Sequence, residues 1–161
     1  MNNQKGFSLI ELLIVVAIIG IIAAISVPNL LKSRQAANEA SATSSVRTIG
    51  TGQATYQSTA GLGKDFATAL SDLKAANFVD GTLGAGSKSG YAFSTTGAPS
   101  TTTNPSYFDT VSTPLSTGNT GSGNSSFYSN ETYVIYRLAG GSAPSGFTST
   151  VRVPTTGTAI Q

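Results

Sequence analysis

The sequence contains no cysteine, no histidine and no tryptophan, and only 10% of its 161 residues are charged. Without cysteine the chain cannot form a disulfide. Without cysteine and histidine it cannot carry a Ser-His-Asp triad, a cysteine nucleophile or the common zinc ligand sets. The net charge of +2 is too small to indicate a nucleic-acid partner. We interpret the chain as a non-enzyme and predict neither a cofactor nor a metal.

The carboxylates are spread along the chain and form no obvious acid–base pair in the sequence. They are Glu11, Glu39, Asp65, Asp72, Asp80, Asp109 and Glu131. Asp80 and Asp109 lie near Asn and Ser oxygens that could contribute to a calcium site, but the regular ligand spacing of a calcium loop is absent. We therefore interpret both side chains as solvated loop residues.

An almost unbroken apolar segment runs from Phe7 to Leu31, and its only ionisable side chain is Glu11, close to its start. About 20 apolar residues are enough to cross a bilayer as a helix, so the segment predicts a membrane span. A carboxylate inside such a span costs about 2.5–3.5 kcal/mol, and less near a helix end. Such a group indicates a functional site whose partner is not yet identified.

The residues Lys5-Gly6-Phe7-Ser8-Leu9-Ile10-Glu11 resemble the processing motif of type IV pilins and the related pseudopilins at every position. That motif is a short basic leader ending in Gly, then Phe, then a Glu four residues later inside an apolar helix. Gly20 and Pro28 also resemble helix-weakening residues of family members. The resemblance covers roughly the first 60 residues by motif, and beyond them the likeness is architectural.

The resemblance implies that residues 1–6 are a leader, removed between Gly6 and Phe7 by a prepilin peptidase, and that the new amino group of Phe7 is N-methylated. It also implies that the Phe7 amine of one subunit meets the Glu11 carboxylate of another inside a filament. Either charge alone is expensive to bury while a pair is tolerated, so the pair would set the register of assembly. The alternative is that Glu11 reaches the lipid headgroups from near the helix end.

Gly20 and Pro28 place weak points inside the apolar segment. Glycine costs about 1 kcal/mol in a helix, and proline removes a backbone hydrogen bond and clashes with the preceding turn. By resemblance, we expect this interval to lose helical bonding in a fibre and to make the fibre extensible. A simple proline kink at the membrane surface is the alternative.

Residues 32–60 continue the helix with a different character. One moderately apolar face repeats at three- and four-residue spacing and consists of Ala42, Val46, Ile49, Gln53 and Tyr56. We expect the helix to run from Phe7 to about Ala60 and to end at Gly61 and Gly63. Its amphipathic half needs a cover, which we expect residues 61–161 to supply as a small globular head.

In the head we expect a short helix from Asp65 to about Asn77 and a turn at Asp80-Gly81. The polar stretches Gly97–Pro105 and Ser116–Ser126 are interpreted as loops, the second of them mobile. Four strands are predicted, at Tyr91–Phe93, Tyr107–Val111, Thr132–Leu138 and Phe147–Val153. Together these elements predict an α+β fold, with a small antiparallel sheet packed on the long helix in a pilin-like arrangement.

The predicted function is that of the major structural subunit of a type IV pilus. The resemblance implies a prepilin in the bacterial inner membrane, with its leader inside, that assembles with its own copies into a helical extracellular filament. It also implies as partners a prepilin peptidase and N-methyltransferase, an assembly platform, and an ATPase, since this chain has no phosphate loop. Motility, adhesion, DNA uptake and electron transfer all stay open as uses of the fibre.

Several alternatives remain. Within the family, the chain could be a type II secretion pseudopilin or a minor pilin. A single-span membrane protein presenting a small binding domain belongs to another class, and it would need neither the Gly6–Phe7 junction nor Glu11. Cleavage of a secretory signal after Ser26 would instead release a soluble protein. Many pilins close their C-terminal region with a disulfide, so the lack of cysteine leaves open how that region is held.

Overall fold

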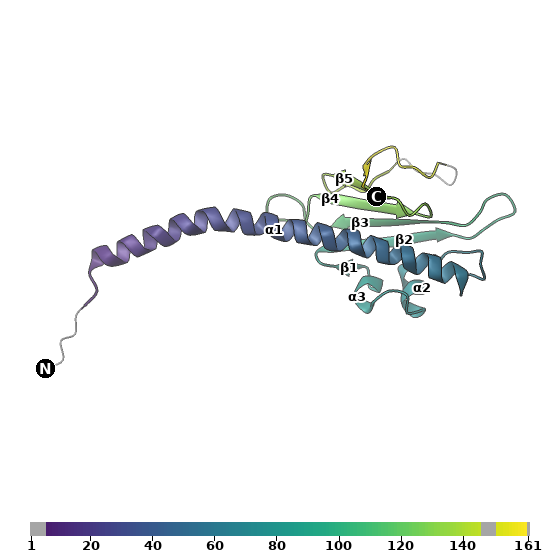
Figure 1. Ribbon diagram of the computed structural model, residues 1–161, viewed down its shortest axis with the longest axis horizontal. Helices are drawn as coiled ribbons and strands as arrows, with labels where there is room; N and C mark the ends of the chain where they lie inside the picture. The colour runs from purple at the N-terminus through teal and green to yellow at the C-terminus, as the bar shows by residue number, and fades with distance from the viewer. Residues whose placement is uncertain (1–5, 146–150, 161) are drawn as a thin grey trace.

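The computed structural model describes residues 6–145 and 151–160. Its longest element is α1, a helix of 50 residues from Leu9 to Ser58. At 1.5 Å per residue α1 is about 75 Å long, and its N-terminal half projects away from a head formed by the rest of the chain (Figure 1). The expected long helix is therefore confirmed, two residues shorter at each end. Leader residues 1–5 lie outside the described residues.

The second half of α1 ends in a turn made by glycines, as predicted. The N–H of Gly61 donates to the carbonyl of Tyr56, and the N–H of Gly63 donates to the carbonyl of Gln57, both at 2.8 Å. These bonds satisfy carbonyls that the end of a helix leaves unpaired. Gly63 has a φ of +76°, in the left-handed region that side chains with a Cβ rarely adopt.

A single antiparallel sheet follows, in which each strand pairs with its neighbours in sequence. Two short helices, α2 (Leu70–Ala75) and α3 (Gly81–Gly84), precede it. The strands are β1 (Ser87–Lys88), β2 (Tyr91–Ala98), β3 (Tyr107–Pro114), β4 (Ser125–Asn130), β5 (Ile135–Ala139) and β6 (Thr158–Ala159). The predicted α+β fold, a long N-terminal helix packed on a small antiparallel sheet, is confirmed.

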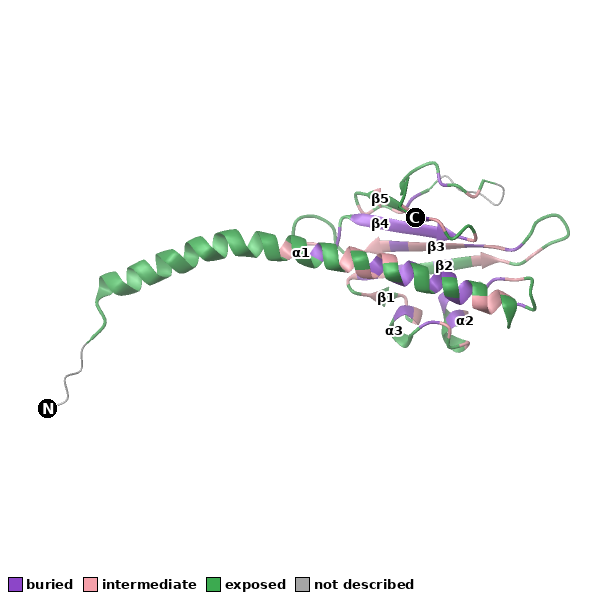
Figure 2. Ribbon diagram, in the orientation of Figure 1, coloured by how far each residue is buried: buried purple, intermediate pink, exposed green. Residues whose placement is uncertain are grey.

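The C-terminal half of α1 lies across one face of this sheet, and burial on α1 is confined to that half (Figure 2). On α1, the side chains of Ala42, Val46 and Ile49 are at most 1% exposed. They share one hydrophobic core with residues of the head that include Leu73, Leu83, Tyr91, Phe93, Phe127 and Ile135. The three- and four-residue spacing in the sequence therefore identified the buried face of the helix.

The strand predictions were only partly correct. Two strands are longer than expected, since β2 extends to Ala98 and β3 extends to Pro114. Strand β5 begins at Ile135 rather than at Thr132, because Tyr133 has a φ of +58° and lies in a turn. Of the strand expected at Phe147–Val153, residues 147–150 lie outside the described residues and 151–153 are not in a strand.

The largest error concerns β4, which the sequence did not predict. All six of its residues are buried, and it pairs with both β3 and β5 in the sheet. Its serine-rich sequence has little hydrophobic signal, and its first two residues fall in the segment that we expected to be a mobile loop. The buried backbone of β4 pairs with both neighbouring strands, and this pairing, not an apolar side-chain pattern, places it in the sheet.

The helical predictions for residues 65–84 also need correction. Helix α2 occupies only Leu70–Ala75, because the side chain of Asp72 accepts from the N–H groups of Thr68 and Ala69 and begins the helix there. Asp80 does not simply form a turn with Gly81. Its carboxylate accepts from the N–H of Leu83 at 2.8 Å and caps α3.

Candidate functional site

The predicted cleavage junction lies in exposed, non-helical chain directly before α1. Gly6, Phe7 and Ser8 are all exposed, and the Phe7 side chain keeps 90% of its accessible surface. Ser8 is the N-cap of α1 and has extended backbone angles. The peptide bond between Gly6 and Phe7 therefore lies in exposed chain outside the helix, where a peptidase can reach it.

Glu11 occupies the third position of α1, and its carboxylate closes the start of the helix. Its Oε2 accepts a hydrogen bond from the N–H of Ser8 at 3.0 Å. A negative charge in the first turn is also favoured by the helix dipole. In the part of the chain that the structure describes, no cation forms an ion pair with this carboxylate.

The capping role of Glu11 was missed from the sequence, although a signal for it was present. Ser8-Leu9-Ile10-Glu11 is a capping-box pattern, in which a Ser is followed three residues later by a Glu. Two roles of Glu11 were considered from the sequence: an ion pair with another subunit and contact with lipid headgroups. The structure adds helix capping as a third. All three place a carboxylate at this position, so a test must separate its charge from its hydrogen bond.

The N-terminal half of α1 presents apolar side chains on all of its faces. In its most apolar stretch, no residue is buried against the rest of the chain. The large side chains from Leu9 to Leu30 are each more than half exposed. This part of α1 is long and apolar enough to cross a membrane. So much exposed apolar surface requires lipid or other protein around it.

α1 continues through both residues that were expected to weaken it. Gly20 has no other atom within 4 Å of the place where a Cβ would lie, so no packing contact requires a glycine there. Pro28 lies inside α1 and cannot donate the backbone hydrogen bond of its turn. The exposed half of α1 is visibly curved (Figure 1). The interval between these two residues is helical in the isolated chain.

The carboxylates weighed as calcium ligands are engaged by other groups of the protein. Asp80 accepts from the Lys88 ammonium at 2.8 Å and caps α3. Asp109 accepts from Arg152 at 2.7 Å and from the Tyr128 hydroxyl at 2.6 Å. Among the residues that the structure describes, no group of three His, Cys, Asp or Glu side chains could hold a metal ion.

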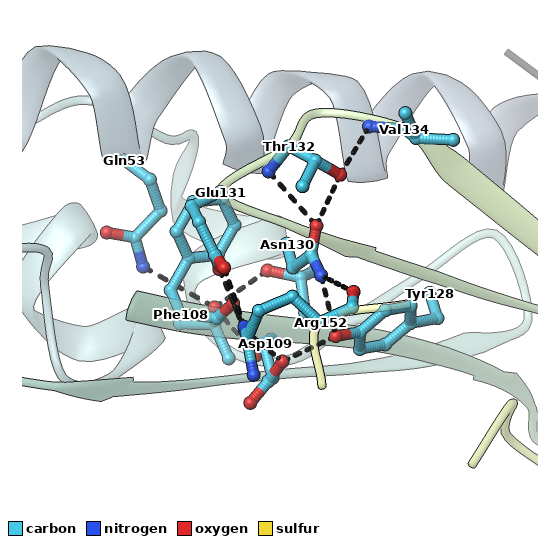
Figure 3. A network of polar contacts seen from close by, with 11 residues as sticks. Gln53, Phe108, Asp109, Tyr128, Asn130, Glu131, Thr132, Val134 and Arg152 are labelled. Atoms are coloured by element: carbon cyan, nitrogen blue, oxygen red, sulfur yellow. Dashed lines mark hydrogen bonds and ion pairs between the residues drawn. The ribbon is translucent and has the colours of Figure 1, made fainter. Parts of the chain in front are cut away.

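Arg152 fastens the C-terminal segment to the sheet, which answers how this region is held without a disulfide (Figure 3). Its guanidinium contacts Glu131 at 2.6 Å and Asp109 at 2.7 Å, and donates to the carbonyl of Phe108 at 2.9 Å. Its own carbonyl accepts from the Asn130 side-chain amide. These bonds join the segment after residue 150 to β3, to β4 and to the turn that follows β4.

Burial gives this network its electrostatic character. The Arg152 side chain is only 15% exposed. Burial disfavours its charge, but hydrogen bonds to Glu131 and Asp109 outweigh this effect and hold the pKa of the guanidinium above its usual value. Burial, followed by the hydrogen bond to Asp109, raises the pKa of the Tyr128 hydroxyl. Arg152 is therefore charged, and Tyr128 protonated, throughout the physiological range of pH.

Comparison with known proteins shows that the N-terminal part of the chain is similar to pilins. Residues 1–27 match the family model described as the prokaryotic N-terminal methylation motif. The chain is 64% identical over 39 residues to the type IV wide pilus major component PilA4 of Thermus thermophilus, covering 24% of this chain and 30% of that protein. It is 40% identical over 68 residues to the type IV major pilin protein PilA of Myxococcus xanthus, covering 42% of this chain and 31% of that protein.

A shorter match of higher identity links the chain to a fimbrial protein of Pseudomonas aeruginosa, with 75% identity over 28 residues, 17% of this chain and 18% of the relative. The chain thus spans about a third or less of the length of the curated relatives that it matches. No solved structure matches it. The resemblance inferred from Gly6 to Glu11 is confirmed by these matches.

Proposed function

We propose that this chain, which has the N-terminal motif and the α+β architecture of a type IV pilin, is the major structural subunit of a type IV pilus. The single observation that carries the proposal is the apolar half of α1, which is uncovered in the isolated chain while the other half of α1 shares a hydrophobic core with the head. Lipid would cover this half in a membrane-inserted precursor. The corresponding helices of other subunits would cover it in a filament.

Processing is the first step of the proposed pathway. A prepilin peptidase cuts the exposed bond between Gly6 and Phe7, and methylation follows on the new Phe7 amine. The apolar half of α1 stays with the mature chain after this cut. Phe7 then carries a positive charge close to the start of an apolar helix, where it needs an acidic partner.

Glu11 of a neighbouring subunit is the proposed partner. Its capping bond to Ser8 uses one carboxylate oxygen, Oε2, so the other oxygen can accept from an incoming amine. Burial of the two groups as a pair is tolerated, whereas a subunit placed out of register would bury both charges unpaired. The pair would therefore select the register of assembly, while apolar contacts along α1 supply the affinity.

Gly20 and Pro28 are proposed to give the fibre its extensibility. Helical hydrogen bonding in this interval is already weakened by the missing donor of Pro28. Loss of the remaining bonds would lengthen each subunit without disturbing the head. Pro28→Ala should stiffen the interval, so fibres of this variant should extend less under load than wild-type fibres.

The deciding experiment is the intact mass and N-terminal sequence of protein sheared from the cell surface. We expect a chain that begins at N-methylated Phe7. A chain beginning at Met1 would indicate a plain membrane anchor, and one beginning at Val27 a secreted domain, and either would overturn the proposal. Recovery of this chain only in trace amounts beside another pilin would point to a minor pilin. A requirement for protein secretion would point to a pseudopilin.

Two variants at one position separate the roles of Glu11. Glu11→Ala removes both the charge and the hydrogen bond, whereas Glu11→Gln removes the charge and keeps an oxygen that can cap Ser8. If the ion pair between subunits matters, both variants should be cleaved and inserted, and both should lower the yield of sheared fibre more than tenfold. Normal fibre yield from Glu11→Gln would leave the carboxylate with a capping role only.

The junction itself can be tested at Gly6. Gly6→Ala should slow cleavage modestly, and Gly6→Val should block it, because the peptidase must fit the residue before the cut. The readout is the ratio of precursor to mature chain on a gel. Complete processing of Gly6→Val would remove the assigned role of Gly6.

A further inference from the structure

A cleft of about 610 Å³ lies where α1 leaves the head. One wall is a face of α1, and the other is the loop between β3 and β4. The cleft is lined mainly by Val27, Pro28, Leu31, Lys32, Asn119 and Asn124. Its volume is within the range of sites that hold small organic molecules.

The two ends of this cleft differ in chemistry. The α1 wall nearest the exposed half of the helix is apolar, whereas hydrogen-bond donors gather at the head end. In the described part of the chain, Lys32 forms no ion pair, and the Asn119 side chain forms no hydrogen bond. The Asn124 side chain accepts from the N–H of Gly118 through its oxygen, which leaves its NH₂ group to donate. One cation and two amides thus face a single cleft.

The cleft also lies at a defined place along the apolar part of the chain. Leu31 is the last residue of the apolar segment, so a helix that spans a bilayer would bring Lys32 to headgroup depth. Strand β3 points toward the exposed half of α1 (Figure 1), so the loop after it lies at this end of the head. Leu115, the first residue of that loop, is 65% exposed.

The loop wall is held in place by α1, so the cleft is already formed in the isolated chain. The amide of Gln35 donates to the carbonyls of Gly118 at 2.6 Å and Gly121 at 3.1 Å. Glu39 accepts from the N–H of Asn124 at 2.9 Å. A preformed site loses less conformational entropy when a ligand enters.

We propose that this cleft binds one anionic phospholipid of the membrane leaflet next to the head. The phosphate would lie against Lys32, Asn119 and Asn124, and an acyl chain would follow the apolar face at Val27 and Leu31. An anionic lipid fits better than a zwitterionic one, because Lys32 lines the cleft and, among the described residues, forms no ion pair with a carboxylate. This proposal rests on the membrane-inserted precursor proposed above.

The test uses the full-length chain reconstituted into nanodiscs of phosphatidylcholine with one-fifth phosphatidylglycerol, then released for native mass spectrometry. We expect wild type to retain one phosphatidylglycerol per chain. Lys32→Gln should lower the fraction of chains that retain phosphatidylglycerol about fivefold, which is the effect expected from removing one cation at a lipid surface. Asn119→Ala should lower it about threefold, the worth of one hydrogen bond.

Lys64→Gln is the matched control, because Lys64 is an exposed lysine in the turn that follows the C-terminal end of α1. It should retain lipid like wild type. Equal losses in Lys32→Gln and Lys64→Gln, or equal retention of both lipids by wild type, would overturn the proposal. Recovery of the chain with a second copy of itself bound, and no lipid, would also overturn the proposal. If Lys32→Gln fails to insert, Asn119→Ala alone decides the matter, because that residue lies in the head.

Failure of this proposal can be told apart from failure of the pilus assignment. A wild-type chain that begins at Phe7 and forms fibres, but retains no phosphatidylglycerol, would overturn the lipid site alone. A chain that retains phosphatidylglycerol but begins at Met1 would keep the lipid site and overturn the pilus assignment.

Discussion

The two halves of α1 have the same secondary structure and opposite surroundings. Up to Leu30 the helix is exposed on every side, and from Gln35 onward one face is buried against the sheet (Figure 2). The exposed half is mainly large and apolar, whereas the buried face includes glycines, a serine and two glutamines. The more hydrophobic half of α1 is therefore the half that the rest of the chain leaves exposed. This indicates that lipid or another subunit surrounds the first half.

The buried glutamines show how the second half achieves specificity. Gln53 is fully buried, and its side chain accepts from the N–H of Ala67 at 2.8 Å and donates to the carbonyl of the same residue at 3.0 Å. Gln35 holds two carbonyls of the loop after β3 in a similar manner. The Gln53 pairing satisfies buried backbone groups that an apolar side chain would leave unpaired, whereas the Gln35 pairing holds carbonyls of a partly exposed loop. Polar residues thus fix where the head sits on α1.

The sharpest test of the comparison replaces the same residue type in each half. Ile49→Ala should destabilise the head by about 2–5 kcal/mol, because the side chain is fully buried in the core. Ile18→Ala should leave head stability nearly unchanged, since Ile18 is 51% exposed and lies well before Gln35, the first buried residue of α1. The measurement is chemical unfolding of the full chain in detergent, followed by near-ultraviolet circular dichroism. Equal losses would contradict the division of the helix.

The Arg152 network on the far side of the sheet should unfold together with the core that lies between the sheet and α1. Arg152→Met should cost about 2–4 kcal/mol, because it leaves the carboxylates of Asp109 and Glu131 without their cation in a poorly solvated site. Lys88→Met, which breaks the exposed pair with Asp80, should cost far less, because water screens that pair. Unfolding curves of the two variants measure the difference. Identical curves would mean that the C-terminal segment adds little to the stability of the head.

A third change tests the polar part of the buried face. Gln53→Met keeps the volume of the side chain and leaves the N–H and carbonyl of Ala67 unpaired, so we expect a loss of about 1–3 kcal/mol. Gln57→Met is the control, because the Gln57 side chain donates an exposed bond to the carbonyl of Lys64. It should cost a few tenths of a kcal/mol. A Gln53 variant as stable as the control would mean that apolar packing alone positions the head.

The smallest effect at neutral pH is expected at Tyr91, whose hydroxyl donates to the carbonyl of Ser125 at 2.8 Å. Tyr91→Phe should cost about 1 kcal/mol. Burial, followed by the charge of Glu39, raises the pKa of Tyr91 to about 12. The folded state thus holds this proton more tightly than the unfolded state, with its ordinary pKa of 10. The resulting stability is complete below pH 10 and is lost as the pH rises toward 12.

The expected measurement is an alkaline unfolding titration of wild type and Tyr91→Phe. Wild type should lose stability steeply between pH 10 and 12, and the variant should lose less over that range. Some alkaline loss should persist in the variant, because the pKa of Tyr128 is also raised. Identical profiles would show that Tyr91 ionises as freely in the folded chain as in the unfolded one.

Local patterns were sufficient for the long helix and for the candidate assembly motif. Each of their signals depends on residues that are close together in the sequence. These signals are an apolar segment of bilayer length, apolar residues at three- and four-residue spacing, and a pair of glycines at the helix end. The antiparallel sheet was also predicted in kind. Strand β4 was not, since four of its six residues are Ser or Asn and its burial comes from flanking strands that lie elsewhere in the sequence.

By itself, the sequence determined the motif from Gly6 to Glu11, the exposed apolar half of α1 and the buried face from Ala42 to Gln53, because these depend on the order and spacing of neighbouring residues. Only the tertiary structure decided how Arg152 holds the C-terminal segment and how Gln35 and Glu39 hold the loop that forms the lipid cleft. Those contacts join residues 21 to 86 positions apart, and a polar residue carries no local sign of its distant partner.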